Sequence, residues 1–137
     1  MNEGTHKNNI TKTASAALPR GAFVKLTAAD AGKVEACSAT DTDALGVLLD
    51  SVEAGDNVAV ELLGVSNRTF VALADGEISA GGKVCLSANG AVKAIPAKGA
   101  SAQTVQVVGL ALGYSVGKGD LVEIVAHRCE QLTIAAQ

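Results

Sequence analysis

Aromatic residues are nearly absent from this sequence of 137 residues, which has no tryptophan and only Phe23, Phe70 and Tyr114. Proteins that bind single-stranded nucleic acid stack the bases on aromatic side chains, and carbohydrate-binding surfaces use similar stacking. Three aromatic residues provide little material for either kind of surface. We therefore expect a core built from valine, leucine, isoleucine and alanine.

Positive charge is also scarce outside the N-terminus. The formal net charge is −3, but residues 1–20 carry Lys7, Lys12 and Arg20 against Glu3, a net charge of +2. The other 117 residues therefore carry −5. Because phosphate binding requires clustered lysine and arginine, this acidic body argues against nucleic acid as a partner.

Cysteine, histidine and long apolar runs are equally limited. Cys37, Cys85 and Cys129 are odd in number and form no CxxC pair, and only His6 and His127 could join them at a metal. This pattern predicts no disulfide framework and no zinc site, and free thiols fit a bacterial cytoplasm. No apolar stretch resembles a signal peptide or reaches the ~18 residues of a membrane helix, so we expect no membrane association.

No catalytic constellation emerges from the residues. The sequence Gly117-Lys118-Gly119-Asp120 superficially resembles a phosphate loop, but it precedes a predicted strand and lacks the helix N-terminus that binds phosphate. Neither histidine stands in a Ser-His-Asp arrangement, and the acidic residues lie on loops. We therefore expect a protein without enzymatic activity, cofactor or metal.

The sequence contains an internal repeat. The stretch Ala54-Gly55-Asp56-Asn57-Val58-Ala59-Val60-Glu61 returns as Lys118-Gly119-Asp120-Leu121-Val122-Glu123-Ile124-Val125. In both copies a Gly-Asp turn precedes apolar residues at every second position, the pattern of a half-buried strand. Glycine provides the unusual φ of such a turn, and aspartate can accept a hydrogen bond from a backbone N–H one or two residues on. We assign structural turn roles to these four residues: Gly55, Asp56, Gly119 and Asp120.

Further matched elements precede each copy, and turn signals recur every eight to twelve residues with no helical periodicity. We predict an all-β fold, a small barrel or sandwich built from two copies of a duplicated β-unit, with an extended N-terminal arm. The predicted boundaries are residues 1–17 for a flexible or extended arm, 18–126 for a single β-domain and 127–137 for a C-terminal tail. Within the domain, the first unit covers about 21–64 and the second about 82–126.

The arm is the candidate docking segment. It is polar and net positive, and Ile10 and Leu18 are its only sizeable apolar anchors. An extended arm can dock by adding a strand to the edge of another sheet. Its candidate partner-binding residues are Ile10, Lys12, Leu18 and Arg20.

Small-residue motifs follow one another along residues 18–126, at 21–24, 44–47, 54–60, 64–65, 72–74, 78–84, 108–112 and 119–124. In order and spacing they resemble those of the capsid cement (head-decoration) proteins of tailed bacteriophages. The resemblance implies a β-rich structural protein of the virion, made in the host cytoplasm and placed on the capsid exterior. It also implies homotrimers that clamp neighbouring major-capsid subunits. From the composition of the arm, and not from the resemblance, we expect Ile10, Lys12, Leu18 and Arg20 to be the residues that bind the capsid.

Two other classes stay open at this point. The chain could be another phage structural or adhesive β-module that binds a small ligand or carbohydrate, although such modules normally expose more aromatic residues. It could also be a carrier domain of the lipoyl or biotinyl kind, which is likewise built from a duplicated β-unit. Lys33 lies near a turn, but it lacks the acidic or methionine neighbour of a modifiable lysine.

Overall fold

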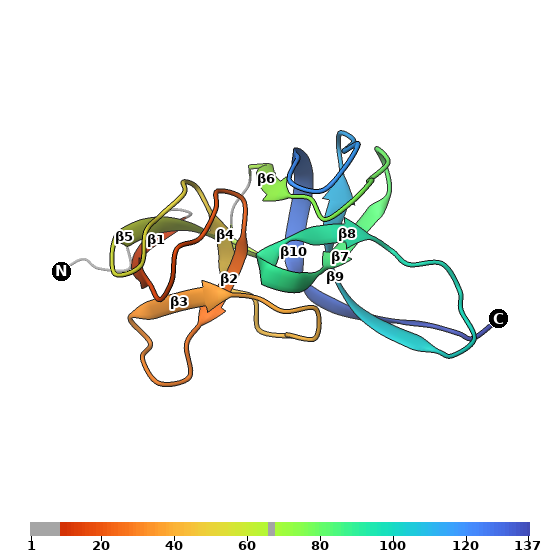
Figure 1. The fold of residues 1–137 in the computed structure, drawn as a ribbon, viewed down its shortest axis with the longest axis horizontal. Helices are drawn as coiled ribbons and strands as arrows, with labels where there is room; N and C mark the ends of the chain where they lie inside the picture. The colour runs from red at the N-terminus through yellow and green to blue at the C-terminus, as the bar shows by residue number, and fades with distance from the viewer. Residues whose placement is uncertain (1–8, 66–67) are drawn as a thin grey trace.

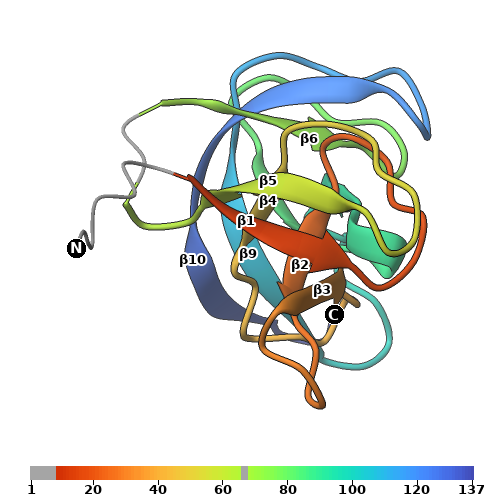
Figure 2. The same cartoon turned by 90° about the vertical axis from the view of Figure 1, so that its left-hand side faces the viewer.

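The computed structural model describes residues 9–65, here the first unit, and residues 68–137, the second unit. The first unit closes into a five-stranded barrel in the order β1-β3-β2-β4-β5 (Figures 1 and 2), made of β1 (Asn9–Ala14), β2 (Phe23–Leu26), β3 (Lys33–Ala36), β4 (Gly46–Leu48) and β5 (Asn57–Leu62). The second unit is a sheet in the order β6-β10-β9-β7-β8, made of β6 (Phe70–Leu73), β7 (Lys83–Leu86), the 3-10 turn η1 (Ala88–Gly90), β8 (Val92–Ala94), β9 (Gln103–Ala111) and β10 (Leu121–Ile134). The predicted all-β class with a small barrel is confirmed.

The two units make the same strand pairings at corresponding positions. β2 pairs antiparallel with β3 and β4, as β7 pairs with β8 and β9. A parallel bridge from the end of β6 to β8 matches the parallel pairing of β1 with β3. Three pairs of opposed residues in the first unit therefore correspond to three pairs in the second. Val24–Gly46 corresponds to Val84–Gly109, Ile10–Val60 corresponds to Phe70–Ile124, and Ala14–Val34 corresponds to Ala74–Val92.

Each unit buries an aliphatic core. The core of the first unit contains Val24, Val34, Leu48 and Val60, together with smaller residues. The cluster of the second unit is larger because it takes in four residues of the first unit: Phe23, Cys37, Val47 and Leu63. The two units therefore share one apolar cluster at their junction, which we call the seam.

Residues 9–14 form a barrel strand and not a free arm. β1 pairs with β5 from Asn9 opposite Glu61 to Thr13 opposite Asn57. This corrects the predicted boundary of the folded body from residue 18 to residue 9, while residues 1–8 of the predicted arm lie outside the described residues. The units also begin earlier than predicted, with β1 and β6, because these strands complete the two sheets.

The predicted tail is likewise mostly strand. β10 pairs with β9 as far as Ile134 opposite Gln103, with a register shift between Ala126 and Glu130. Beyond the shift the two strands form a ribbon that extends from the second unit towards the C-terminus (Figure 1). Leu132 and Ile134 of this ribbon pack against a small buried cluster that contains Cys85 and Val105. The alternation of apolar residues is interrupted at 127–129, which hides this continuation in the sequence.

Candidate functional site: a pocket at the seam

Backbone hydrogen bonds join the two units at the seam. Leu73 N–H donates to the carbonyl of Gly21 (3.1 Å), and Gly90 N–H donates to the carbonyl of Cys37 (2.8 Å). Gly21 has a φ of +86°, and a Cβ there would lie only 2.9 Å from the backbone nitrogen of Leu73. A glycine at this position therefore allows the loop before β2 to lie directly against β6.

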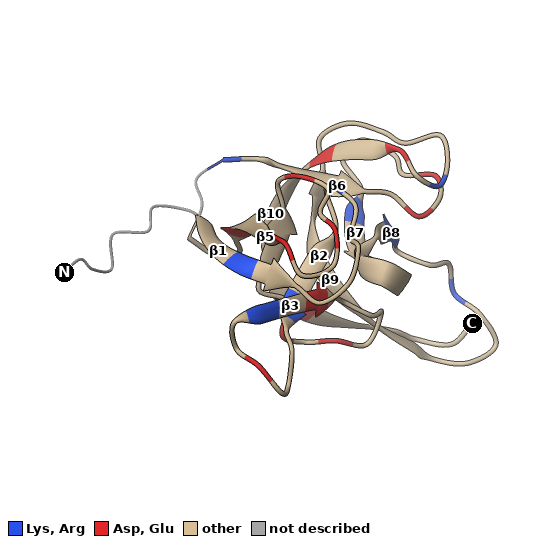
Figure 3. Cartoon of the chain, turned by 60° about the vertical axis from the view of Figure 1, so that its left-hand side comes forward, with Lys and Arg blue, Asp and Glu red and all other residues tan. Residues whose placement is uncertain are grey.

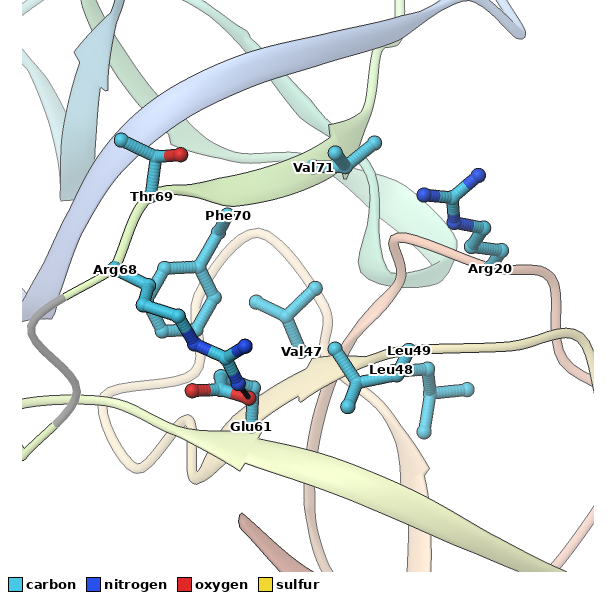
Figure 4. Close-up of a pocket in the computed structure, with 9 residues that line it drawn as sticks. All are labelled: Arg20, Val47, Leu48, Leu49, Glu61, Arg68, Thr69, Phe70 and Val71. Atoms are coloured by element: carbon cyan, nitrogen blue, oxygen red, sulfur yellow. Dashed lines mark hydrogen bonds and ion pairs between the residues drawn. The ribbon is translucent and has the colours of Figure 1, made fainter. Parts of the chain in front are cut away.

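A pocket of about 390 Å³ opens beside these contacts (Figure 4). Its lining comes from the loop before β2, from β4 and β5 of the first unit, and from β6 with the residues before it: Arg20, Val47, Leu48, Leu49, Glu61, Arg68, Thr69, Phe70 and Val71. The Glu61 side chain is only 3% exposed, and its carboxylate accepts a hydrogen bond from Nη2 of Arg68 (3.0 Å). This ion pair crosses the seam and holds the Arg68 side chain, itself 60% exposed, at the pocket.

Arg20 lies at the opposite end of the pocket from Arg68 (Figure 4). Its backbone N–H donates to Ser51 Oγ (3.2 Å), but its guanidinium has no hydrogen-bond partner in the described part of the chain. The pocket carries two guanidinium groups and one buried carboxylate, so its net charge is positive. The side chains between the two arginines are apolar. An arginine fork is suited to a carboxylate or phosphate. The pocket can therefore receive an anionic group carried on an apolar stem.

The structure separates the four predicted partner-binding residues. Leu18 is buried in the first barrel, where it bridges to Val52, and Ile10 packs partly against the same core. Neither is an exposed anchor. Lys12 Nζ donates to the carbonyl of Ala31 (2.8 Å) on the side of the barrel where β1 meets β3. Of the four predicted residues, Arg20 alone lines the pocket.

The sequence analysis did not single out the other charged residues of the pocket. Glu61 belongs to the repeated stretch, but it lies outside the alternating apolar positions at Val58 and Val60, so the pattern gave no signal that this carboxylate is buried. Arg68 follows the two residues between the units. Because their ion pair depends on how the units pack, the spacing of the two residues alone could not indicate it.

The two Gly-Asp turns have the same backbone geometry. Gly55 and Gly119 have φ values of +86° and +94° and donate to the carbonyls of Ala14 and Ala74 (both 2.9 Å), which ties each turn to the end of β1 or β6. The aspartate contact differs from the predicted one. In both turns the backbone carbonyl of the aspartate accepts a hydrogen bond, from Ala14 N–H to Asp56 (2.9 Å) and from Ala74 N–H to Asp120 (2.8 Å). Asp120 Oδ2 also accepts from Val116 N–H (3.0 Å), four residues earlier, a side-chain contact that Asp56 does not make within the described residues.

The thiols are placed for packing. All three cysteines are free, and burial raises the pKa of the Cys37 thiol to about 12. Nearby, hydrogen bonds from Ser38 N–H and Lys25 lower the pKa of Asp41 against the opposing effect of burial, and Lys25 Nζ lies 2.9 Å from Oδ1. Among the described residues there is no group of three or more potential metal ligands. No helix in that part of the chain is long and apolar enough to cross a membrane.

Charged residues are dispersed over the molecule and do not form one basic face in the view of Figure 3, where acidic and basic segments alternate over loops and strands.

Comparison with known proteins gives a likeness of fold. No protein-family model and no curated protein matches the chain. A solved structure, the head fibre gp8.5 N base of bacteriophage phi29, matches with a TM-score of 0.66 over 89% of this chain and 95% of that chain. The two sequences are 16% identical. The match covers both units, so the fold as a whole is shared with that phage protein.

Proposed function

We propose that this chain is a non-enzymatic structural protein of a bacteriophage head, placed on the exterior of the capsid. The observation that carries the proposal is the likeness of fold to a phage head fibre base over nearly the full length of both chains. The order of small-residue motifs, which resembles that of capsid cement proteins, supports the same role independently of the fold. The matched strand pairings also support an origin of the chain by internal duplication.

The proposed partner is the major capsid protein, whose neighbouring subunits the protein clamps as a homotrimer. Many weakly bound copies on a symmetric lattice can stabilise a shell through multivalency. A protein in this role requires a compact body and a contact surface but no reaction centre.

We propose the seam pocket as a contact point with the capsid. Arg20 would bind a carboxylate of the capsid protein, while the apolar stem of that side chain lies against the wall near Val47 and Phe70. Hydrogen bonds to charged groups contribute about 1.5–3 kcal/mol, so the loss of this contact should weaken binding roughly ten- to a hundredfold. The pocket replaces the predicted free arm as the docking element, because Ile10 and Leu18 are engaged in the barrel.

Co-sedimentation tests the proposal. The full chain is mixed with expanded capsids that lack it, beside an Arg20→Gln variant and a Lys98→Gln control. The control removes one exposed positive charge from a loop of the second unit, away from the pocket. We expect saturable binding of the wild type and the control, and much weaker binding of Arg20→Gln. Absence of wild-type binding contradicts the capsid role, and equal binding by all three proteins contradicts the role of the pocket.

A further inference from the structure

The outward face of the second sheet carries four exposed aliphatic side chains with two half-buried ones beside them. We call this group the apolar face: exposed Leu110, Leu112, Leu121 and Val125, and half-buried Leu73 and Val71, the last of which also lines the seam pocket. These side chains are adjacent across three strands, because Leu73 lies opposite Leu121, Val71 opposite Glu123, and Leu110 opposite Val125. Leu110 and Val125 are 39% and 48% exposed. Contiguous exposed apolar surface of this kind marks interaction sites in soluble proteins.

The fold itself does not require apolar residues on β6 and β10 of this face, as the first unit shows. At the corresponding positions of β1 and β5 the first unit carries Thr11 and Thr13, and Asn57 and Glu61. These polar residues occupy the same pairing positions without disturbing the strands. The aliphatic character of the second face therefore needs an explanation other than the stability of the sheet.

One row of this face shows how the fold uses it. In the first unit the row Phe23–Val47–Glu61 is at most 2% exposed, because the second unit covers it at the seam. In the second unit the corresponding row is Lys83–Leu110–Val125, and it is open. The chain thus contains one covered and one uncovered copy of the same surface. What covers the first copy is another unit of the same fold.

We infer that the apolar face is a self-association surface, bound by a second copy of this chain. The charges of the apolar face favour a second copy of this chain over an unrelated protein, because Glu123 lies within the face and Lys83 lies at its margin. Neither residue forms an ion pair within the described part of the chain. Two copies facing each other can pair the lysine of one with the glutamate of the other, while the aliphatic side chains are buried between them. The inference deepens the proposed function by naming the surface of self-association.

Sedimentation velocity of the full chain in the absence of capsids tests this surface separately from capsid binding. Wild-type protein at about 1–100 µM, the range in which weak specific complexes form, should sediment as a concentration-dependent oligomer. A Leu110→Lys variant should weaken self-association at least tenfold. The control is Leu26→Lys, an equally exposed leucine of the first unit (39%), which should associate like the wild type. Circular dichroism verifies that both variants are folded.

Exchanging the charges of Lys83 and Glu123 distinguishes specific binding of a second copy of the chain from non-specific adhesion. Lys83→Glu and Glu123→Lys should each weaken association, and the double variant should restore it towards the wild-type level. A wild type that remains monomeric throughout the concentration range overturns the inference, as does a Leu110→Lys variant that associates normally. If the charge exchange has no effect while Leu110→Lys dissociates the oligomer, the pairing of these two charges is wrong and the apolar surface stands. Capsid co-sedimentation is unaffected by these outcomes as a test of the seam pocket.

Discussion

Replacing Gly46 by alanine tests the strand pairing of the first barrel most directly. Gly46 lies between Val24 of β2 and Leu62 of β5, and an added Cβ would lie 2.1 Å from the backbone oxygen of Glu61 and 2.7 Å from Cγ1 of Val60. The oxygen belongs to the neighbouring strand and cannot rotate away, so the strands themselves must move. Overpacking of a well-packed interior costs about 1–3 kcal/mol, and a backbone clash this close places the expected loss at the upper end, about 3 kcal/mol.

Urea unfolding followed by circular dichroism measures this loss. With a denaturant slope of about 1–3 kcal/mol per molar, a loss of about 3 kcal/mol lowers the midpoint by roughly 1–3 M. Gly109→Ala at the matching position of the second unit should behave similarly, because its Cβ would lie 2.4 Å from the backbone oxygen of Val125.

The matched control is Gly113→Ala, where nothing lies within 4 Å of the added Cβ. Alanine there should change the free energy of unfolding by less than about 1 kcal/mol, and it can be stabilising because it restricts the unfolded chain. If Gly46→Ala unfolds within about 0.5 kcal/mol of the wild type, the close approach of β4 to β5 is wrong and the argument from strand register fails.

Three further predictions concern side chains. Asp120→Ala should lower the free energy of unfolding by about 1 kcal/mol and Asp56→Ala by clearly less, because only the Asp120 carboxylate accepts a hydrogen bond from the turn; equal losses in urea unfolding would contradict this. A thiol reagent at pH 8 should modify Cys129 first in the native protein. It should leave buried Cys37, whose pKa is about 12, unmodified until the protein unfolds. Mass spectrometry of digested samples gives the order in which the cysteines are modified. Because the pKa of Asp41 is lowered in the folded state, its ionised form stabilises the fold above pH ~4, and this contribution is lost as the pH falls further. The Asp41→Asn variant should therefore be less stable than the wild type at pH 7, and the difference in stability should shrink in acid. A difference in stability that is independent of pH would refute this.

Sequence periodicity was sufficient for the strands that alternate clearly. The stretches after the Gly-Asp turns carry apolar residues at every second position, and the structure places β5 and β10 there. The apolar runs before the turns form β4 and β9. β1 was missed because its neighbours in the barrel, and not its own composition, make it a strand. Thr11 and Lys12 give it the polar character of a free segment. A signal was nevertheless present, since Ile10 and Leu18 precede Phe70 and Ile78 by the same sixty residues.

The site was less predictable than the fold. Arg20 was identified as a candidate for its charge, but its environment arises from β6, fifty residues later in the chain. The burial of Leu18 likewise follows from a bridge to Val52 that local pattern does not specify. Contacts between units depend on how two similar bodies pack, and periodicity within one strand carries no information about that.

The shared cluster at the seam has a consequence for how the protein unfolds. Phe23, Val47 and Leu63 belong to strands or loops of the first unit, yet they complete the interior of the second. If the first unit opens, the second loses part of its interior, and if the second opens, these first-unit side chains lose their cover. Two similar units joined in tandem usually melt in separate steps if their interface is slight, but here we expect a single cooperative transition in calorimetry. The two units are then expected to gain and lose their structure together.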